Sequence, residues 1–302
     1  MSSDNVYHPG ELAVQRLAGA EAIAEQNGRM IKSRFPKGAA VFLSKQTLII
    51  ASSIDKNGNV WCSMLTGNPG FIELLDEVTM VIDAVPVEGD PLIHHLGGHS
   101  NLGLLAIDLY KKSRLRMNGQ AMVDSDHRLV VNIEQVYGNC PKYIQRRTAL
   151  FEAGSRRVPK LAERSSELNA VQSAQIRNAD TFFIGSIGPE GNADASHRGG
   201  PPGFVKTLDE RTLLFPDYYG NSMFNTLGNI YCNPSTGLLF VDFDNGHYLQ
   251  LTGRSEIIWE DNEISRFPGA ERLVRFEIDE VLYIEQGTNR VWVIENKEEE
   301  RW

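Results

Sequence analysis

The chain has 302 residues, of which 41% are hydrophobic, and a formal net charge of −9 from 39 acidic and 30 basic residues. This length allows one large domain or two ordinary ones, with enough apolar residues for a packed core. The acidic balance, without a basic run, argues against nucleic-acid binding. The longest apolar stretches have only the length of a strand, which argues against a membrane span.

The N-terminal residues and the cysteines indicate the cellular compartment to expect. Met1 to Pro9 are polar and lack the apolar region of a signal peptide. Cys62, Cys140 and Cys232 are few, odd in number and far apart, which argues against a disulfide framework or a thiolate metal site. We therefore expect a cytoplasmic protein.

Hydrophobic patterning predicts many short strands and few helices. In chain order these are a helix at 11–26, strands at 48–54, 78–82, 104–109, 115–122 and 130–137, helix in part of 148–178, strands at 182–187 and 212–215, a helix at 225–232, and strands at 238–243, 248–259 and 274–284. Such a pattern is typical of β-barrels.

The chain contains an internal repeat. Residues 53–84 align without a gap with residues 186–217, and thirteen of the 32 positions are identical, against roughly two expected by chance from ordinary residue frequencies. A second block aligns 103–108 with 237–242 and Gly119 with Gly253. A period above 100 residues indicates two domains rather than a solenoid.

The repeat divides the chain into five segments. These are an N-terminal helical lead-in (1–37), a first barrel repeat (38–147), a connecting segment (148–173), a second barrel repeat (174–294) and a charged tail (295–302). The predicted fold is therefore mainly β, with two tandem barrels in one chain.

The two copies differ in their polar residues. The second copy contains a predicted turn at Ser196, His197, Arg198 and Gly199. This turn presents a hydroxyl, an imidazole, a guanidinium and a backbone that glycine leaves accessible, and these groups suit an anion such as phosphate. The first copy has Met64 and Leu65 in place of His197 and Arg198. The alternative is that Arg198 makes only a structural surface pair.

The first copy has its own polar segment, Asn139-Cys-Pro-Lys-Tyr-Ile-Gln-Arg-Arg147, and the second copy has nothing similar at 284–290. We interpret the two specialisations as halves of one composite site. His94, His95 and His99 lie in a Gly-rich loop without nearby carboxylates, so we interpret them as loop residues and expect no metal.

These motifs resemble the pyridoxamine 5′-phosphate oxidase-like, FMN-binding split-barrel family. Ser196-His-Arg-Gly-Gly-Pro-Pro-Gly-Phe204 resembles the family's Ser-Pro-Arg-Gly-Asp-Pro-Pro-Gly-Phe turn, and Leu213-Leu-Phe-Pro-Asp-Tyr-Tyr-Gly-Asn221 continues the match. Cys140-Pro-Lys-Tyr-Ile144 resembles its Cys-x-Lys segment. The segment His8-Pro-Gly-Glu-Leu-Ala-Val-Gln-Arg16 resembles the start of proteins in a branch of this family that carries two copies of the barrel.

The resemblance implies two split barrels that form a pseudo-dimer within one chain, with FMN between them. We expect a single FMN, in contact with residues of both copies: Ser196, His197, Arg198, Gly199, Phe215, Asp217, Asn221, Arg114, Arg116, Cys140, Lys142, Tyr143 and Arg146. Arg114 and Arg116 are included because residues two apart on a strand share a face. The sequence departs from the family at His197 (Pro expected), Met223 (Arg expected) and Asn225 (Asp expected).

The expected function is that of an FMN-dependent oxidoreductase, with an unknown substrate and no assigned catalytic residue. The electron donor would be NAD(P)H or a separate reductase, and the chain would act as a monomeric pseudo-dimer or a homodimer. The alternatives are a protein that holds flavin, haem or a deazaflavin without turnover or serves as an electron-transfer partner, and a structural pseudo-dimer without a cofactor.

Overall fold

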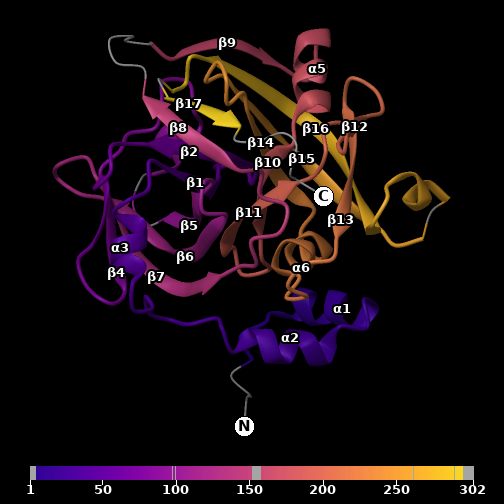
Figure 1. The fold of residues 1–302 in the computed structure, drawn as a ribbon, viewed down its shortest axis with the longest axis horizontal. Coiled ribbons are helices and arrows are strands. Elements are labelled where there is room, and N and C mark those ends of the chain that lie inside the picture. The colour runs from indigo at the N-terminus through magenta and orange to yellow at the C-terminus, as the bar shows by residue number, and fades with distance from the viewer. Residues whose placement is uncertain are drawn as a thin grey trace.

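The computed structural model describes residues 5–96, 98, 100–151, 158–260, 262–288 and 290–294. His99 and the predicted tail at 295–302 lie outside this set, as do residues 1–4 of the predicted lead-in and residues 152–157 of the predicted connecting segment. Two antiparallel sheets lie side by side, the first from the N-terminal half and the second from the C-terminal half (Figure 1).

The first sheet has seven strands in the order β2-β1-β5-β6-β7-β4-β3. Their bounds are β1 (Leu48–Ile54), β2 (Val60–Thr66), β3 (Ile72–Leu74), β4 (Thr79–Ile82), β5 (Ser100–Asp108), β6 (Ser113–Val123) and β7 (Leu129–Gly138).

The second sheet has the path β11-β10-β14-β15-β16-β13-β12, and β9 also pairs with β16. The bounds are β9 (Lys160–Ser165), β10 (Thr181–Ile187), β11 (Ala193–Gly199), β12 (Lys206–Thr207), β13 (Thr212–Tyr218), β14 (Ser235–Val241), β15 (Tyr248–Ile258) and β16 (Ala270–Glu285). A separate two-stranded sheet pairs β8 (Arg147–Phe151) with β17 (Arg290–Ile294).

The two strand orders are the same when β1–β7 are replaced by β10–β16. The pairing register agrees as well, because Ile107 pairs with Arg114 in the first sheet and Val241 pairs with Tyr248, 134 residues later, in the second. The predicted fold class is therefore confirmed: the chain is mainly β and forms two tandem split barrels as an intrachain pseudo-dimer.

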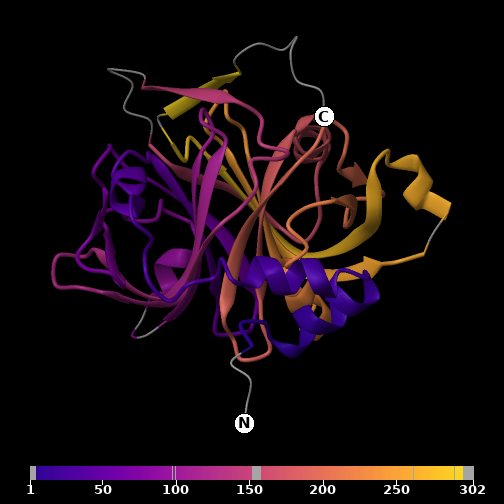
Figure 2. The same cartoon turned by 60° about the horizontal axis from the view of Figure 1, so that its bottom comes forward.

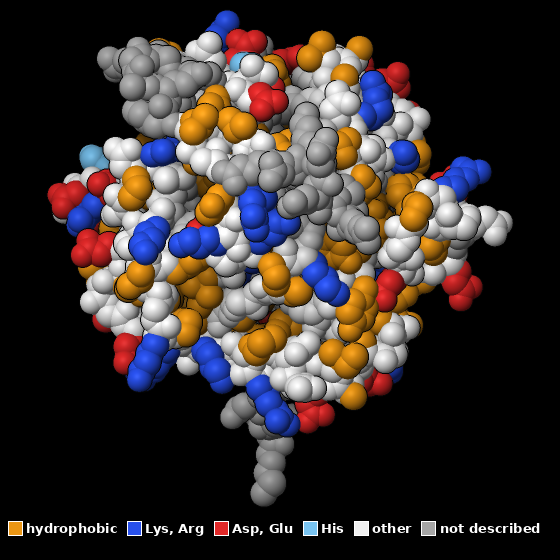
Figure 3. All heavy atoms as spheres, in the orientation of Figure 1, with side chains coloured by type: hydrophobic (Ala, Val, Ile, Leu, Met, Phe, Trp, Pro, Cys, Tyr) orange, Lys and Arg blue, Asp and Glu red, His pale blue; other side chains and the backbone are white. Residues whose placement is uncertain are grey.

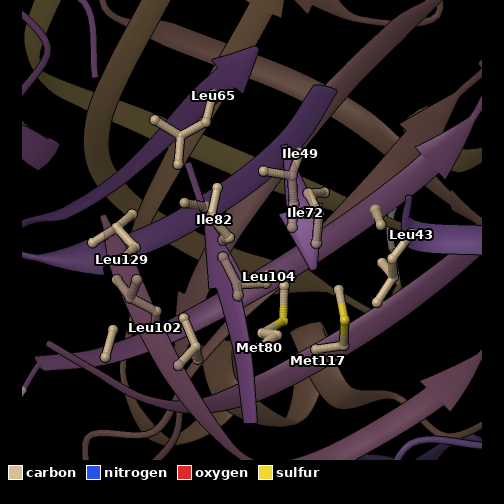
Figure 4. Close-up of a cluster of buried hydrophobic side chains, with 14 of the residues drawn as sticks. Leu43, Ile49, Leu65, Ile72, Met80, Ile82, Leu102, Leu104, Met117 and Leu129 are labelled. Carbon is tan, nitrogen blue, oxygen red and sulfur yellow. The ribbon is translucent and has the colours of Figure 1, made fainter. Parts of the chain in front are cut away.

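Each barrel has its own core, and a third core lies between them. Strand β1 shows how, because its alternating side chains face opposite ways: Ile49 and Ala51 enter the first barrel core, while Leu48 and Ile50 enter the core shared with the second barrel. Figure 4 shows the first core, with Ile49 among Leu and Met side chains. Burial on both faces explains why this stretch is apolar without alternation.

The barrels contact each other in a two-fold pattern: β11 packs on β5 and β6, and β2 packs on β14 and β15. Glycines permit this approach. A Cβ at Gly103 would lie 2.4 Å from Cα of Asp194, and one at the matching Gly237 would lie 2.6 Å from the carbonyl oxygen of Val60. Glycine at this matching position of both repeats therefore allows the two barrels to approach each other closely.

Six α-helices surround the sheets in the described part of the chain: α1 (Pro9–Leu17), α2 (Glu21–Gly28), α3 (Ala39–Leu43), α4 (Leu92–His95), α5 (Ala170–Asn178) and α6 (Asn225–Cys232), with a 3₁₀ turn at Asn262–Arg266. Helix α6 has the predicted bounds. The single helix expected at 11–26 is instead two helices, because the chain turns at Gly19 with φ of +63°.

The N-terminal helices α1 and α2 lie along the lower edge of the molecule beside α6, as both ribbon views show (Figures 1 and 2). Only α5 is helical among the described residues of 148–178, where β8 and β9 supply two strands. None of the helices in the described ranges combines the length and hydropathy that crossing a bilayer would need.

Candidate functional site

A pocket of about 100 Å³ opens where β11 meets β6, between the two barrels. Eleven of the thirteen predicted site residues line it: Arg114, Arg116, Cys140, Lys142, Tyr143, Ser196, His197, Arg198, Gly199, Asp217 and Asn221. Figure 3 shows Lys and Arg side chains gathered near the middle of the face seen in Figure 1. The fold thus brings segments from both repeats together.

Arg114 and His197 meet across the boundary between the repeats, with Nη1 2.9 Å from Nδ1. A guanidinium can only donate, so Nδ1 accepts and the imidazole proton lies on Nε2, which has no hydrogen-bond partner. Burial, then the charges of Arg114, Arg147 and Arg198, hold the pKa of His197 well below its ordinary value. His197 is therefore neutral at pH 7.

Arg198 belongs to a second polar group, at the end of β13. Its Nη1 lies 2.5 Å from Oδ1 of Asp217, and Nη1 of Arg272 lies 3.0 Å from Oδ2 of the same carboxylate. Asp217 thus bridges two arginines, and Arg198 keeps Nε without a partner. Arg272 also pairs with Glu271, at 2.7 Å, so the carboxylates of Asp217 and Glu271 balance the charges of these two arginines.

Arg116 forms a buried ion pair with Asp194 on β11, and its guanidinium lies 5.1 Å from the centre of the Tyr137 ring. The Tyr137 hydroxyl also donates to Asp194, at 3.2 Å. Asp194 raises the pKa of Arg116 and outweighs burial, so this guanidinium stays charged. Its charge is balanced, which distinguishes it from Arg114.

The segment after β7 reaches across to the second repeat. A Cβ at Gly199 would lie 2.0 Å from the Tyr143 carbonyl oxygen, so glycine permits this contact. The Tyr143 ring stacks on Tyr218, with centroids 5.2 Å apart, and Lys142 Nζ lies 4.7 Å from the centre of the Tyr219 ring. First-repeat residues therefore form one wall of the pocket.

The lining of the pocket carries a net positive charge. Arg114, Arg116, Lys142 and Arg198 line it together with Asp217. Since Asp194 balances Arg116 and Asp217 pairs with Arg198, the excess comes from Arg114 and Lys142. No carboxylate in the described ranges pairs with Arg114, and burial and its neighbours Arg116 and Arg198 lower its pKa to about 10. This donor set fits an anionic group such as phosphate.

Two predicted site residues lie elsewhere. Phe215 is buried in the second barrel core, where its ring meets Phe182 edge-on at 5.0 Å. Arg146 is exposed, and its guanidinium lies 5.8 Å from the centre of the Tyr110 ring. Neither lines the pocket, because Phe215 points into the barrel and Arg146 lies beyond the segment that touches the second repeat.

Sequence reasoning also missed residues. Asn225, at the start of α6, lines the pocket, and Arg272 binds Asp217 from the neighbouring strand. Arg272 sits opposite Asp217 in the β13–β16 register, which the sequence alone does not define. Met223, where the family has Arg, is fully buried with Tyr7 and is not part of the pocket lining, so the missing cation is not replaced there.

The matching position on the other side of the pseudo-dimer is filled by side chains. Tyr248 and Gln250 occupy the strand positions that Arg114 and Arg116 occupy in the first repeat. Both are fully buried, and Gln250 Nε2 lies 3.2 Å from Ser63 Oγ and 3.1 Å from Asp90 Oδ2. The carboxyl group of Asp90 thus lies beside Gln250, and above its pKa of about 6 its negative charge disfavours an anion.

The site contains no cluster suited to a metal ion. Among the residues that the structure describes, no three or more His, Cys, Asp or Glu side chains converge. The prediction that His94 and His95 are loop residues is wrong, because both lie in the short helix α4, where Asp90 Oδ1 accepts from the Leu92 N–H at 2.8 Å. His95 Nδ1 lies 2.8 Å from Ser53 Oγ.

Comparison with known proteins gives a family for the second repeat. Residues 168–300 match the model of the family described as pyridoxamine 5′-phosphate oxidase. A search of curated proteins found no match.

Several solved structures are similar to parts of the chain. A putative pyridoxamine 5′-phosphate oxidase from Lactobacillus delbrueckii is 18% identical, with 39% of this chain and 94% of that chain covered and a TM-score of 0.33. HupZ from Group A Streptococcus is 13% identical (37% and 90% covered, TM-score 0.31). An FMN-binding protein from Syntrophomonas wolfei is 11% identical (37% and 81% covered, TM-score 0.30).

Proposed function

We propose that the chain, whose residues 168–300 match the pyridoxamine 5′-phosphate oxidase family, binds one FMN between its two repeats and acts as an oxidoreductase. The flavin would supply the redox chemistry, and the protein its position and surroundings. NAD(P)H or a separate reductase would supply electrons.

The excess of positive charge in the pocket carries this proposal. Among the residues that the structure describes, no carboxylate pairs with the partly buried guanidinium of Arg114, and no acceptor meets the buried donors His197 Nε2 and Arg198 Nε. Leaving such donors unsatisfied costs free energy, so a protein retains them where a ligand completes them. Arg114, Arg198 and the first N–H groups of α6 would hold the phosphate.

The size of the pocket indicates how a ligand enters. Its volume of about 100 Å³ is below the roughly 300–1,000 Å³ of typical ligand sites, and we expect side chains to move when a ligand binds. Arg198 is one-fifth exposed and bound to Asp217. We expect Arg198 to exchange Asp217 for the phosphate, while Arg272 keeps Asp217 paired.

The site would be single. Tyr248 and Gln250 replace Arg114 and Arg116 at the matching position, and Met64 and Leu65 replace His197 and Arg198, so these arginines are missing there. A visible absorption spectrum, with flavin counted per chain after denaturation, tests the stoichiometry. One FMN per chain supports the proposal; two would contradict the single site; none, even after reconstitution, would refute flavin binding.

A second candidate is a protein that holds flavin without turnover. It is favoured by the neutrality of His197, the pocket's only imidazole, which cannot act as an acid at pH 7. Anaerobic addition of NADH or NADPH to the FMN-loaded protein distinguishes the two. Rapid bleaching of the flavin followed by reoxidation in air supports the oxidoreductase; an unreactive flavin supports the carrier.

A further inference from the structure

The loop at 220–225 forms one wall of the pocket and leads into α6. Gly220, Asn221, Ser222 and Phe224 all line the pocket. Ser222 and Phe224 have φ of 58° and 59°, in the left-handed region that residues other than glycine rarely adopt. Such a conformation persists only where the surroundings hold it.

The N-terminal helices supply that support. Asn27 Nδ2 on α2 donates to the Asn221 carbonyl oxygen at 2.7 Å, and Gln15 Nε2 on α1 donates to the Met223 carbonyl oxygen at 3.0 Å. The two bonds span 194 and 208 positions of the sequence, respectively, and they hold the backbone on either side of Ser222. Neither helix lines the pocket itself.

A third contact fixes the start of α6. Glu11 on α1 accepts from Asn225 Nδ2 through Oε1 at 2.5 Å and from the His8 N–H through Oε2 at 2.8 Å. One carboxylate thus caps its own helix and holds the first residue of the helix that borders the pocket. Below the loop, Met223 is fully buried against Tyr7 and its neighbours.

We propose that Gln15 and Asn27 are positioning residues that hold the loop at 220–225, and with it the start of α6, in the conformation that binds the phosphate of the cofactor. This rests on the proposed FMN site. The two side chains act through backbone carbonyl groups, so their effect falls on the geometry of the loop rather than on the charge of the pocket. The N-terminal lead-in would then be a third component of the site, beside the two repeats.

The test compares FMN with riboflavin, which lacks the phosphate, in variants that keep side-chain size but cannot donate: Asn27→Leu and Gln15→Met. We expect the dissociation constant of FMN, measured by fluorescence titration of the flavin-free protein, to rise about tenfold for each variant, as expected for one lost hydrogen bond. The riboflavin constant should change less than twofold. Gln26→Ala, an exposed neighbour on α2, is the control.

Equal losses for FMN and riboflavin would overturn the proposal, because they would indicate general damage; unchanged FMN affinity would overturn it as well. Hydrogen–deuterium exchange of the flavin-free protein gives a second readout. Amides at 220–228 should exchange at least fivefold faster in both variants than in the wild type and in Gln26→Ala. If the wild type binds neither flavin, the proposed function fails, and unchanged exchange would separately refute the role of Gln15 and Asn27 in holding the loop.

Discussion

Nη1 of Arg114, from the first repeat, lies 2.9 Å from Nδ1 of His197, from the second. The contact places a guanidinium without a carboxylate partner next to an imidazole whose pKa lies well below its ordinary value. A charged guanidinium and a neutral imidazole whose Nε2–H can donate therefore meet at the boundary between the repeats. The pseudo-dimer provides this contact, and a single repeat does not.

Arg114→Met should stabilise the ligand-free protein and weaken its response to anions. The folded protein lowers the pKa of Arg114 to about 10, so holding this charge costs stability at neutral pH. We expect the free energy of unfolding to rise by about 1 kcal/mol, since methionine keeps the packing of the stem. Urea unfolding measures it, with the exposed Arg34→Met as control.

The same variant should lose most of the thermal stabilisation that phosphate gives the wild type, because a ligand that binds only the folded state stabilises it in proportion to its affinity. Equal phosphate effects on the wild type and Arg114→Met would show that this arginine does not take part in anion binding.

Arg198→Leu should weaken FMN binding by about 10- to 100-fold, since a charged hydrogen bond contributes roughly 1.5–3 kcal/mol. Asp217 remains paired with Arg272 in this variant, so the fold should persist. The reverse change, Leu65→Arg, does not serve as a neutral control, because Leu65 is 1% exposed in the first barrel core, where a guanidinium would disrupt the packing. Flavin titration of the apoprotein measures the effect, and an unchanged constant would contradict a role for Arg198.

FMN should protect Cys140 from thiol reagents. Cys140 and Cys232 are exposed, but only Cys140 lines the pocket. Cys62 is buried, which raises the pKa of its thiol and makes it unreactive. Alkylation followed by mass spectrometry should show Cys140 labelled several-fold more slowly with FMN, whereas Cys232 labelling stays the same. Equal labelling of Cys140 with and without FMN would place the flavin elsewhere.

Asp90 makes the matching position of the pseudo-dimer sensitive to pH. Burial raises its pKa to about 6, and hydrogen bonds from Ser63, Leu92 and Gln250 only partly oppose this. The unfolded chain releases this proton near pH 4. The carboxyl's contribution to stability is therefore full below pH 4 and is lost as pH rises to about 6.

We expect the free energy of unfolding of Asp90→Asn, relative to the wild type, to increase by up to about 2 kcal/mol between pH 4 and pH 6 and to stay level above that. Urea unfolding across this range measures the difference, and the exposed Asp279→Asn controls for the substitution itself. A relative stability that is flat with pH, or falls as pH rises, would contradict the burial of a titrating Asp90.

The sequence by itself determined the fold class, because alternating apolar residues define strands and the repeated glycines and turns give both halves one topology. It also identified most residues of the pocket, such as Arg198 and Cys140, because the two repeats differ from each other at the positions of these polar side chains. Only the tertiary structure decided that Phe215 points into a core, that Arg272 shares Asp217, and that Gln15 and Asn27 reach the loop at 220–225. Such contacts depend on strand register and on how separate segments pack, and neither is encoded in local spacing.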